Sequence, residues 1–540
     1  MRKRPLVASI AGGALTMTLA TLVVRILGLI RWGTQAGQVG SVGVAEAYAA
    51  ANLVPNVLFE VVAGGALAGA LVPLLTAHIV AGAMRKFDAT ISAILTWTVC
   101  LLAALGVLLA VGAPWIVQLI PRVSDPDLYA LTVLFLRVFS VQLPLYGVSI
   151  VLTGALQAKK LFAWPAMAPG LSSLVVIATY VLFGHMAGGT QGNVGVVPHA
   201  AVQVLAWGTT AGVAALSLPL LIPVRAAGIS LRPRWRLSAT DRRRLAKFAA
   251  AGLAGLLFQQ CAVVVTMVVL NAAGIAGAYP TWQYAQAVIM VVYGVLIVPV
   301  ATAAFPALSR SWAGKDRDEF ALAGAAGLRM IAAIAVVGAT TMVAAAEPVQ
   351  AFFGFTRGGV AGMSQAVAWS GISLVPLALN FYLGRVLLAA HRTRASGIGT
   401  ASGWAAAGCL VVVAGVVGGA EGASAGGAAD VLTRVAMATA AGQVVGAIVL
   451  GGMVRRLLGS PMFAGSWRGI LTVVAVTGTL AALARLCGPS AASLSITSGL
   501  MWSALYASVI GVAAAAVIAL WCRDDVKVLL RSEPEGHDGP

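Results

Sequence analysis

The segment Arg25-Ile26-Leu27-Gly28-Leu29-Ile30-Arg31 ends the first long apolar stretch of the sequence, which carries no charge from Pro5 to Val24. An arginine inside a bilayer span costs roughly 2.5–3.5 kcal/mol even on lenient insertion scales, so such residues usually face a wet cavity or a partner. Arg25 and Arg31 therefore predict that the chain meets an anionic partner within the membrane.

The whole composition is that of a membrane protein. The 540 residues are 60% hydrophobic and 10% charged, with a mean hydropathy of +0.94, whereas roughly a quarter of the residues in soluble domains are charged. Long, unalternating apolar runs predict helices of about 20 residues each. We expect an all-α integral membrane fold with about 14 transmembrane helices. Their centres are expected near Ala20, Leu67, Leu101, Val141, Val175, Gly212, Ala262, Leu296, Ile334, Leu379, Val411, Val444, Val476 and Val509.

The net charge of +18 does not indicate a nucleic-acid partner, because the basic residues gather in alternate loops between the apolar runs. This arrangement follows the positive-inside rule and places both termini in the cytoplasm. The first apolar run imitates a signal peptide. It is longer than a typical signal core and Arg25 follows in the same helical pattern, so we expect it to be retained. The basic clusters lie at 2–4, 85–86, 159–160, 225–247, 310–317, 392–394, 455–468 and 523–531.

No catalytic, metal or cofactor motif is recognisable, and external loops are too short for a large active site. We therefore expect no enzyme activity, no metal and no cofactor. The cysteines show no CxxC spacing and are expected to be small core residues. They are Cys100, Cys261, Cys409, Cys487 and Cys522.

A weak internal repeat predicts two lobes. Pro73 and Pro306 lie 233 residues apart, while Pro144 and Pro376, and Lys159 and His391, lie 232 apart. Frequent prolines and basic inner loops are the alternative explanation. Two parallel repeats are typical of transporters with a site near the midplane. The expected parts are an N-terminal lobe of six helices (1–225), a basic cytoplasmic linker (226–247), a C-terminal lobe of six helices (248–460), two extra helices (461–523) and a cytoplasmic tail (524–540).

Polar residues gather in the second predicted helix. Glu46 and Glu60 are the acidic residues that clearly lie in or at the edge of a span, and Asn52 and Asn56 lie between them. Polar groups at membrane depth usually line a cavity or a hinge. We expect gating or ion pairing here, and the alternative for Glu60 is a purely structural pairing with an arginine.

Further arginines and helix breakers complete the candidate site. Arg137 is a candidate for binding substrate beside Arg25 and Arg31, whereas Arg385 lies near the inner surface and is expected to snorkel. The second lobe shows amides rather than an intramembrane acid, so no cation site is recognisable there; these are Gln259, Gln260, Gln283, Gln286 and Asn380. The expected helix hinges are Gly28, Pro73, Pro144, Pro306 and Pro376.

The segment from Arg25 to Arg31 resembles the R-x-x-G-x-x-R motif that opens the lipid II flippase family (MurJ/MviN). The other similar segments, in chain order, are Glu46-Ala47-Tyr48, Leu53-Val54-Pro55-Asn56, Gly64-Gly65, Leu71-Val72-Pro73-Leu74, Tyr284-Ala285, Tyr293-Gly294-Val295 and Phe305-Pro306-Ala307-Leu308-Ser309.

The resemblance implies a fold of the multidrug/oligosaccharidyl-lipid/polysaccharide exporter type in the bacterial cytoplasmic membrane. It implies that lipid II, the undecaprenyl-diphosphate peptidoglycan precursor, is flipped from the inner to the outer leaflet by alternating access, for building the cell wall and maintaining cell shape. The family's cavity arginines fall on Arg25 and Arg31 and its helix-two acid on Glu46.

The chain departs from the family pattern at Phe59 and Ala287, where many relatives carry arginine. Two alternatives therefore stay open: an exporter of another polyprenyl-linked glycan, or a non-transporting scaffold that recruits cell-wall synthesis proteins. A drug exporter for cations is less well supported, since acids are few.

Overall fold

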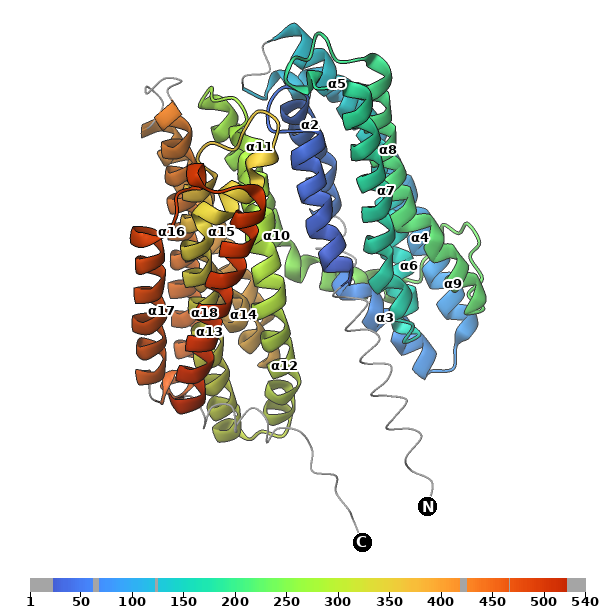
Figure 1. The fold of residues 1–540 in the computed structure, drawn as a ribbon. Helices are drawn as coiled ribbons and strands as arrows, with labels where there is room; N and C mark the ends of the chain where they lie inside the picture. Colours follow the sequence, from blue (N-terminus) through green and yellow to red (C-terminus); the bar gives the residue numbers. More distant parts are fainter. Residues whose placement is uncertain (1–22, 62–67, 122–124, 418–424, 466, 522–540) are drawn as a thin grey trace, which may run out of the picture. The chain divides into compact units, whose positions relative to one another are not determined.

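The computed structural model describes residues 23–61, 68–121, 125–417, 425–465 and 467–521 (Figure 1). Within these ranges every regular element is a helix, and 12 helical segments are long and apolar enough to cross a membrane. The predicted all-α membrane architecture is confirmed. The count of about 14 spans is not established, because the two remaining predicted centres, Ala20 and Leu67, lie outside the described residues.

The chain forms two compact units. Unit 1 consists of Met1–Leu256 and Thr356–Gly358, and unit 2 consists of Leu257–Phe355 and Gly359–Pro540. The division falls inside α10 (Ala239–Ala272), which starts within the predicted linker. The finer division into lobes, linker, extra helices and tail stays a prediction.

Unit 1 contains a helix at 23–38 and a series of helices that follow it (Figure 1). Local sequence sets their ends: Asp125 accepts a hydrogen bond from the Asp127 amide at the start of α5, with Pro126 at the first helical position. A left-handed Gly188 (φ 57°) ends α7. The helices are α2 (Val44–Phe59), α3 (Ala68–Val80), α4 (Met84–Gln118), α5 (Pro126–Ser140), α6 (Gln142–Ala158), α7 (Ala163–Ala187), α8 (His199–Ser217) and α9 (Leu221–Ala226), with short 3-10 turns at Thr190–Gly192 and Leu218–Leu220.

Unit 2 continues from α10 through a second helical series. Its π-helical turn η4 (Tyr293–Ile297) joins α11 to α12, and Asp316 caps α13 by accepting a hydrogen bond from the Glu319 amide. The remaining helices are α11 (Ala278–Val292), α12 (Val298–Ala313), α13 (Arg317–Phe352), α14 (Met363–Ala389), α15 (Thr393–Val417), α16 (Ala425–Leu458), α17 (Arg468–Cys487) and α18 (Ile496–Trp521), with 3-10 turns at Phe353–Phe355, Ser460–Phe463 and Ala491–Ser493.

The two proline motifs of the repeat occupy comparable places in their own units. Leu71 and Leu75 belong to a buried cluster of unit 1 built from α3, α4, α6 and α9. Ala304 and Leu308 belong to a buried cluster of unit 2. In each motif the central proline is exposed while the residues two positions before and two after it are buried.

Small residues bring α15 and α16 into close contact. A Cβ atom on Gly442 would lie 2.3 Å from the Cα of Ala407, and one on Gly446 would lie 2.8 Å from the Cα of Gly403. Lipid and core side chains are equally apolar, so close backbone approach supplies much of the packing energy between membrane helices. The glycines of α15 and α16 therefore allow the two backbones to pack closely, and larger side chains at these positions would push the two helices apart.

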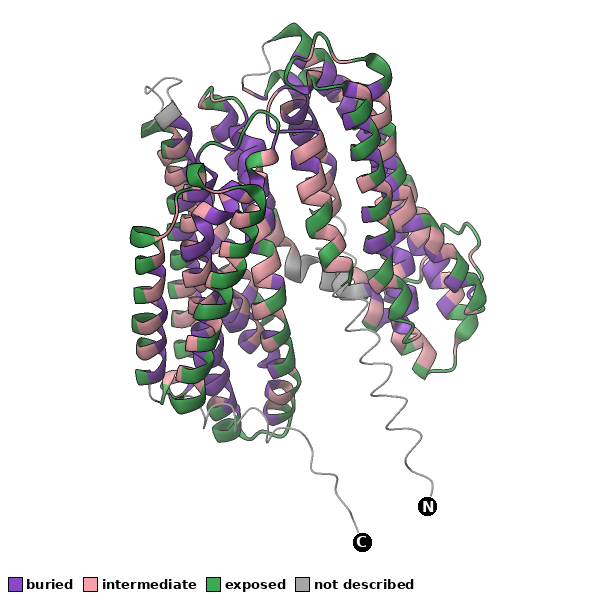
Figure 2. Cartoon of the chain, viewed as in Figure 1, coloured by how far each residue is buried: buried purple, intermediate pink, exposed green. Residues whose placement is uncertain are grey.

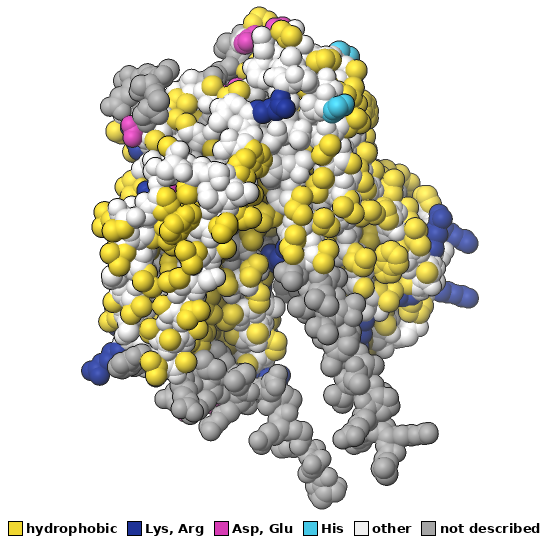
Figure 3. Space-filling model, viewed as in Figure 1, with side chains coloured by type: hydrophobic (Ala, Val, Ile, Leu, Met, Phe, Trp, Pro, Cys, Tyr) yellow, Lys and Arg dark blue, Asp and Glu magenta, His cyan; other side chains and the backbone are white. Residues whose placement is uncertain are grey.

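Many large apolar side chains are exposed in both units, as expected for helices in lipid. Figure 2 shows exposed positions along the helices, and apolar side chains cover much of the face seen in Figure 3. The cysteines illustrate this. All four that the structure describes, Cys100, Cys261, Cys409 and Cys487, are exposed, so the prediction that they are core residues was wrong. Apolar neighbours in sequence do not distinguish a lipid-facing position from a core position. Cys522 lies outside the described residues.

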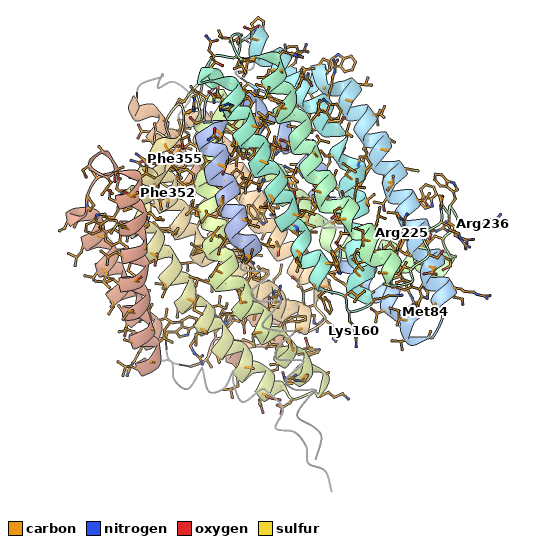
Figure 4. All side chains as sticks on the ribbon, turned by 45° about the vertical axis from the view of Figure 1, so that its right-hand side comes forward. Met84, Lys160, Arg225, Arg236, Phe352 and Phe355 are labelled. Carbon is orange, nitrogen blue, oxygen red and sulfur yellow. The ribbon has the colours of Figure 1, made fainter. Side chains whose placement is uncertain are left out.

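The basic segment that follows α9 is held along α4. The amides of Arg232 and Arg234 donate to the side chains of Ser92 and Thr96, each at 3.1 Å. Lys160, Arg225 and Arg236 lie on the same end of unit 1 as Met84, where α4 begins (Figure 4). Unit 1 thus carries a basic end, as the charge pattern predicts.

Candidate functional site

Arg25 and Arg31 lie on the helix at 23–38 and both are half-buried. Six residues separate them, which is about 9 Å of rise and roughly 600° of rotation, so a straight helix turns them to different faces. The helix runs unbroken through Gly28, and its Val24 side chain packs beside Gly170 of α7. A bend at Gly28 stays a prediction.

Arg31 belongs to a cluster of polar groups within unit 1. Its guanidinium lies 5.3 Å from the ring centre of Trp32. Its charge acts on the hydroxyl groups of both Tyr48 and Tyr146, and the charge of Glu60 acts on Tyr146. The structure therefore brings Arg31 close to Tyr48 and Tyr146 and brings Glu60 close to Tyr146, which the sequence did not indicate.

A chain of side-chain hydrogen bonds fixes the helix that carries Arg31. Tyr180 donates to Gln35 Oε1 at 3.1 Å, and the Tyr180 and Tyr48 hydroxyls lie 2.9 Å apart. Tyr48 also lies 3.3 Å from the hydroxyl of Thr209. Because Gln35 is one helical turn beyond Arg31, this chain ties the arginine to α2, α7 and α8.

The amides and the deeper acid of α2 have different surroundings. Asn56 Oδ1 accepts a hydrogen bond from Tyr146 at 3.0 Å, and Phe59 stacks on the same tyrosine with ring centres 4.3 Å apart. Asn52 is half-buried, while Glu60 is exposed at the end of the described part of this segment. Gly64 and Gly65 lie outside the described residues.

Glu46 stabilises the N-terminus of α2. Its carboxylate accepts a hydrogen bond from the Gly43 amide at 3.1 Å and so caps the start of α2. Gly43 has a positive φ of 63°, and a Cβ there would lie 2.6 Å from the carbonyl oxygen of Gln191. Gating by Glu46, Glu60, Asn52 or Asn56 stays a prediction.

Arg137 lies exposed in the last turn of α5, just before a break at Val141. Pro144 follows in the first turn of α6, so a predicted hinge lies beside an observed interruption of the helical span. Substrate contact by Arg137 stays a prediction.

The other predicted hinges lie inside helices. Pro73 is within α3, Pro306 within α12 and Pro376 within α14. The interruption of the α11–α12 span is the π turn from Tyr293 to Ile297, which precedes Pro306. Bending at these prolines stays a prediction.

Two features escaped the sequence analysis. The tyrosines around Arg31 were missed. Tyr48 lies in the Glu46-Ala47-Tyr48 segment, so the sequence could have indicated this one tyrosine as a candidate site residue. The aromatic surroundings of Arg385 were also missed: the residue is half-buried, with its guanidinium 4.4 Å from the ring centre of Phe381 and 6.0 Å from that of Phe305, and its reach to the inner surface stays a prediction.

The chain is similar to known transporters over most of its length. A family model described as lipid II flippase MurJ matches residues 36–527. The lipid II flippase MurJ of Burkholderia cenocepacia is 28% identical over 384 residues, which cover 68% of this chain and 70% of that protein.

Two solved structures establish the fold. A lipid II flippase MurJ in an inward closed conformation matches with a TM-score of 0.73 at 17% identity and covers 95% of this chain and 100% of that one. An inward-facing multidrug resistance MATE family transporter of the MOP superfamily matches with a TM-score of 0.63 at 14% identity, covering 83% of this chain and 99% of that one.

Proposed function

This chain belongs to the lipid II flippase MurJ family, and we propose on that basis that it carries lipid II from the inner to the outer leaflet by alternating access. The observation that carries the proposal is the family match over residues 36–527. The family is one of transporters, and the 12 candidate spans fit a multi-pass protein of the bacterial cytoplasmic membrane.

Arg25 and Arg31 are proposed to bind the diphosphate of lipid II. A guanidinium group stays charged at any physiological pH and can donate two parallel hydrogen bonds to phosphate oxygens. The half-burial of both side chains and the hydrogen-bonded support of the Arg31 helix favour a fixed cationic site over free surface arginines.

Other residues of unit 1 are proposed to modulate this site. Arg31 and Glu60 both act electrostatically on Tyr146, which supports the proposal that the acid competes with a phosphate for interaction with Arg31. Phe59, at a position where the family pattern suggests arginine, stacks on the same tyrosine. Fewer cations in this region imply that Arg31 carries more of the binding than it does in relatives with the added arginine.

The orientation of the chain is also a proposal. The basic end of unit 1, with Lys160, Arg225 and Arg236 (Figure 4), is proposed to face the cytoplasm, together with both termini. We propose further that the protein works without enzyme activity or a cofactor, with membrane lipids around it and with cell-wall synthesis proteins as partners.

The test uses the full chain reconstituted in vesicles that carry lipid II with a labelled headgroup. Wild type is expected to move the headgroup to the far leaflet faster than empty vesicles do. If wild type moves no lipid II but rescues growth in cells depleted of their own flippase, the transport function is wrong and the scaffold alternative stands. Movement of another polyprenyl-linked glycan in place of lipid II would favour the other exporter.

A further inference from the structure

Unit 2 contains a cavity of its own. Its volume is about 570 Å³, which lies in the usual range for small-molecule sites. Four aromatic side chains, Tyr293, Phe305, Phe381 and Trp404, line it, and they come from η4, α12, α14 and α15. The cavity is therefore assembled from helices that are distant in sequence and pack within one unit.

Arg385 places a fixed positive charge in this cavity. The ring of Phe381 lies 4.4 Å from its guanidinium, so part of one face of the charged plane is covered. Its Nε atom is buried and has no hydrogen-bond partner among the described residues. An arginine held by aromatic contacts with an unmet donor is prepared to bind an acceptor that the chain itself does not supply.

Two amides beside the arginine are also incompletely satisfied. Asn380 donates to the backbone oxygen of Gln443 at 3.0 Å and to its side-chain oxygen at 2.9 Å. This leaves Asn380 Oδ1 and Gln443 Nε2, both buried, without a partner in the part of the chain that the structure describes. Buried polar atoms are normally paired, so one unmet acceptor and two unmet donors in one cavity point to a polar occupant.

The charge of the lining selects an anion. None of the described residues that line the cavity is Asp or Glu, whereas Arg385 contributes a positive charge. The hydroxyl groups of Ser396 and Thr400 lie in the same wall, and each donates to a backbone carbonyl, so their oxygens remain free to accept. A cation would find no carboxylate here.

We propose that this cavity binds an anionic sugar, that is, a sugar ring that bears a phosphate or carboxylate group. The anion pairs with Arg385, the amides of Asn380 and Gln443 bond to hydroxyl or acetamido groups, and the apolar face of the ring packs on an aromatic wall. This inference rests on the proposed function insofar as the sugar is supplied by the headgroup of lipid II. It gives unit 2 a headgroup site of its own, built from residues other than Arg25 and Arg31.

The experiment measures binding to the purified full chain in detergent. The probes are N-acetylglucosamine 1-phosphate, neutral N-acetylglucosamine, inorganic phosphate and lipid II, and the signal is the change in tryptophan fluorescence that Trp404→Phe removes. Arg385→Gln is expected to weaken the sugar phosphate about ten- to a hundredfold, the effect of losing a charged hydrogen bond. The matched control is Arg392→Gln, which removes an exposed arginine outside the cavity.

A second variant keeps the test valid if Arg385→Gln fails to fold. Gln443→Glu preserves the acceptor for Asn380, removes the Nε2 donor and adds a negative charge. It should therefore weaken binding of the sugar phosphate more than binding of the neutral sugar, because only the sugar phosphate is also repelled by the added charge. A dependence on Arg385 that is seen with lipid II alone identifies the lipid-linked headgroup as the occupant.

The inference is overturned if both variants bind the sugar phosphate and lipid II like wild type. Neutral sugar or inorganic phosphate binding as tightly as the sugar phosphate also overturns it. Wild-type translocation of lipid II together with unchanged binding by Arg385→Gln refutes the cavity site and leaves the flippase function standing. Binding that depends on Arg385 in a protein that moves no lipid II refutes the function and not the site.

Discussion

The hydroxyl groups of Tyr48, Tyr180 and Thr209 have fewer hydrogen atoms to donate than they have oxygen contacts. Counting these donors predicts which tyrosine substitution destabilises the protein more. Tyr180 donates to Gln35, and Thr209 donates to the backbone oxygen of Leu205 at 2.7 Å. Only the Tyr48 proton is left for its contacts with Tyr180 and Thr209 at 2.9 and 3.3 Å. Tyr48→Phe therefore removes one hydrogen bond and keeps the aromatic ring, so it should lower the free energy of unfolding by the contribution of that single bond.

Hydrogen bonds in membrane proteins average about 0.6 kcal/mol and reach about 1.7 kcal/mol. Tyr48→Phe should cost an amount in that range. Tyr180→Phe should cost more, about 1–3 kcal/mol, because it leaves Gln35 Oε1 buried without a donor. Tyr180→Phe should also reduce lipid II transport more than Tyr48→Phe, since it frees the helix that carries Arg31.

Thermal unfolding of the two variants in the same detergent gives the order directly, and vesicle flipping gives the functional order. Tyr146→Phe is the comparator, because it removes a single bond to Asn56 in the same unit. A loss for Tyr48→Phe that exceeds the loss for Tyr180→Phe would refute the proton count. Wild-type stability in both Tyr48→Phe and Tyr180→Phe would refute the hydrogen-bond chain itself.

Two further changes test the packing of α15 against α16 and the basic end of unit 1. Gly442→Ala should lower the unfolding temperature, because its Cβ meets the α15 backbone at 2.3 Å, while Gly452→Ala on the same helix has open space and should raise it slightly; the same sign for both would contradict the packing. Asp241→Asn removes a buried charge that lies 3.5 Å from His78 and accepts a hydrogen bond from Thr90 at 3.3 Å. It should destabilise the start of α10 by about 1–3 kcal/mol and speed trypsin cleavage of the basic segment before it; unchanged cleavage would contradict this.

Hydropathy and charge patterning were sufficient for the fold class. Twelve of the predicted span centres lie within the 12 candidate spans of the structure, from Leu101 in the first to Val509 in the last. The position of each membrane-spanning helix in the sequence depends on the local content of apolar residues, which can be read directly from the sequence. The direction in which each helix face points depends on its neighbours in space, and this explains why the exposed cysteines were placed wrongly.

The candidate site was only partly predictable. Arg25 and Arg31 could be identified because a charge in an apolar run is costly wherever it points. The aromatic surroundings of Arg385 were missed, because the sequence indicates the depth of a residue in a span and not the side chains that lie beside it. The cavity beside Arg385 joins Gln259 to Gln443, residues that are distant in sequence and that only tertiary packing brings together.

The most direct test of the account is the affinity of the full chain for lipid II in Arg25→Gln and Arg31→Gln, with exposed Arg85→Gln as the control. Loss of a charged hydrogen bond to phosphate predicts binding weakened about ten- to a hundredfold in each of the first two variants, and transport falling with it. The control should match wild type. If both variants fold normally and bind and move lipid II as wild type does, the cationic site on the 23–38 helix does not exist.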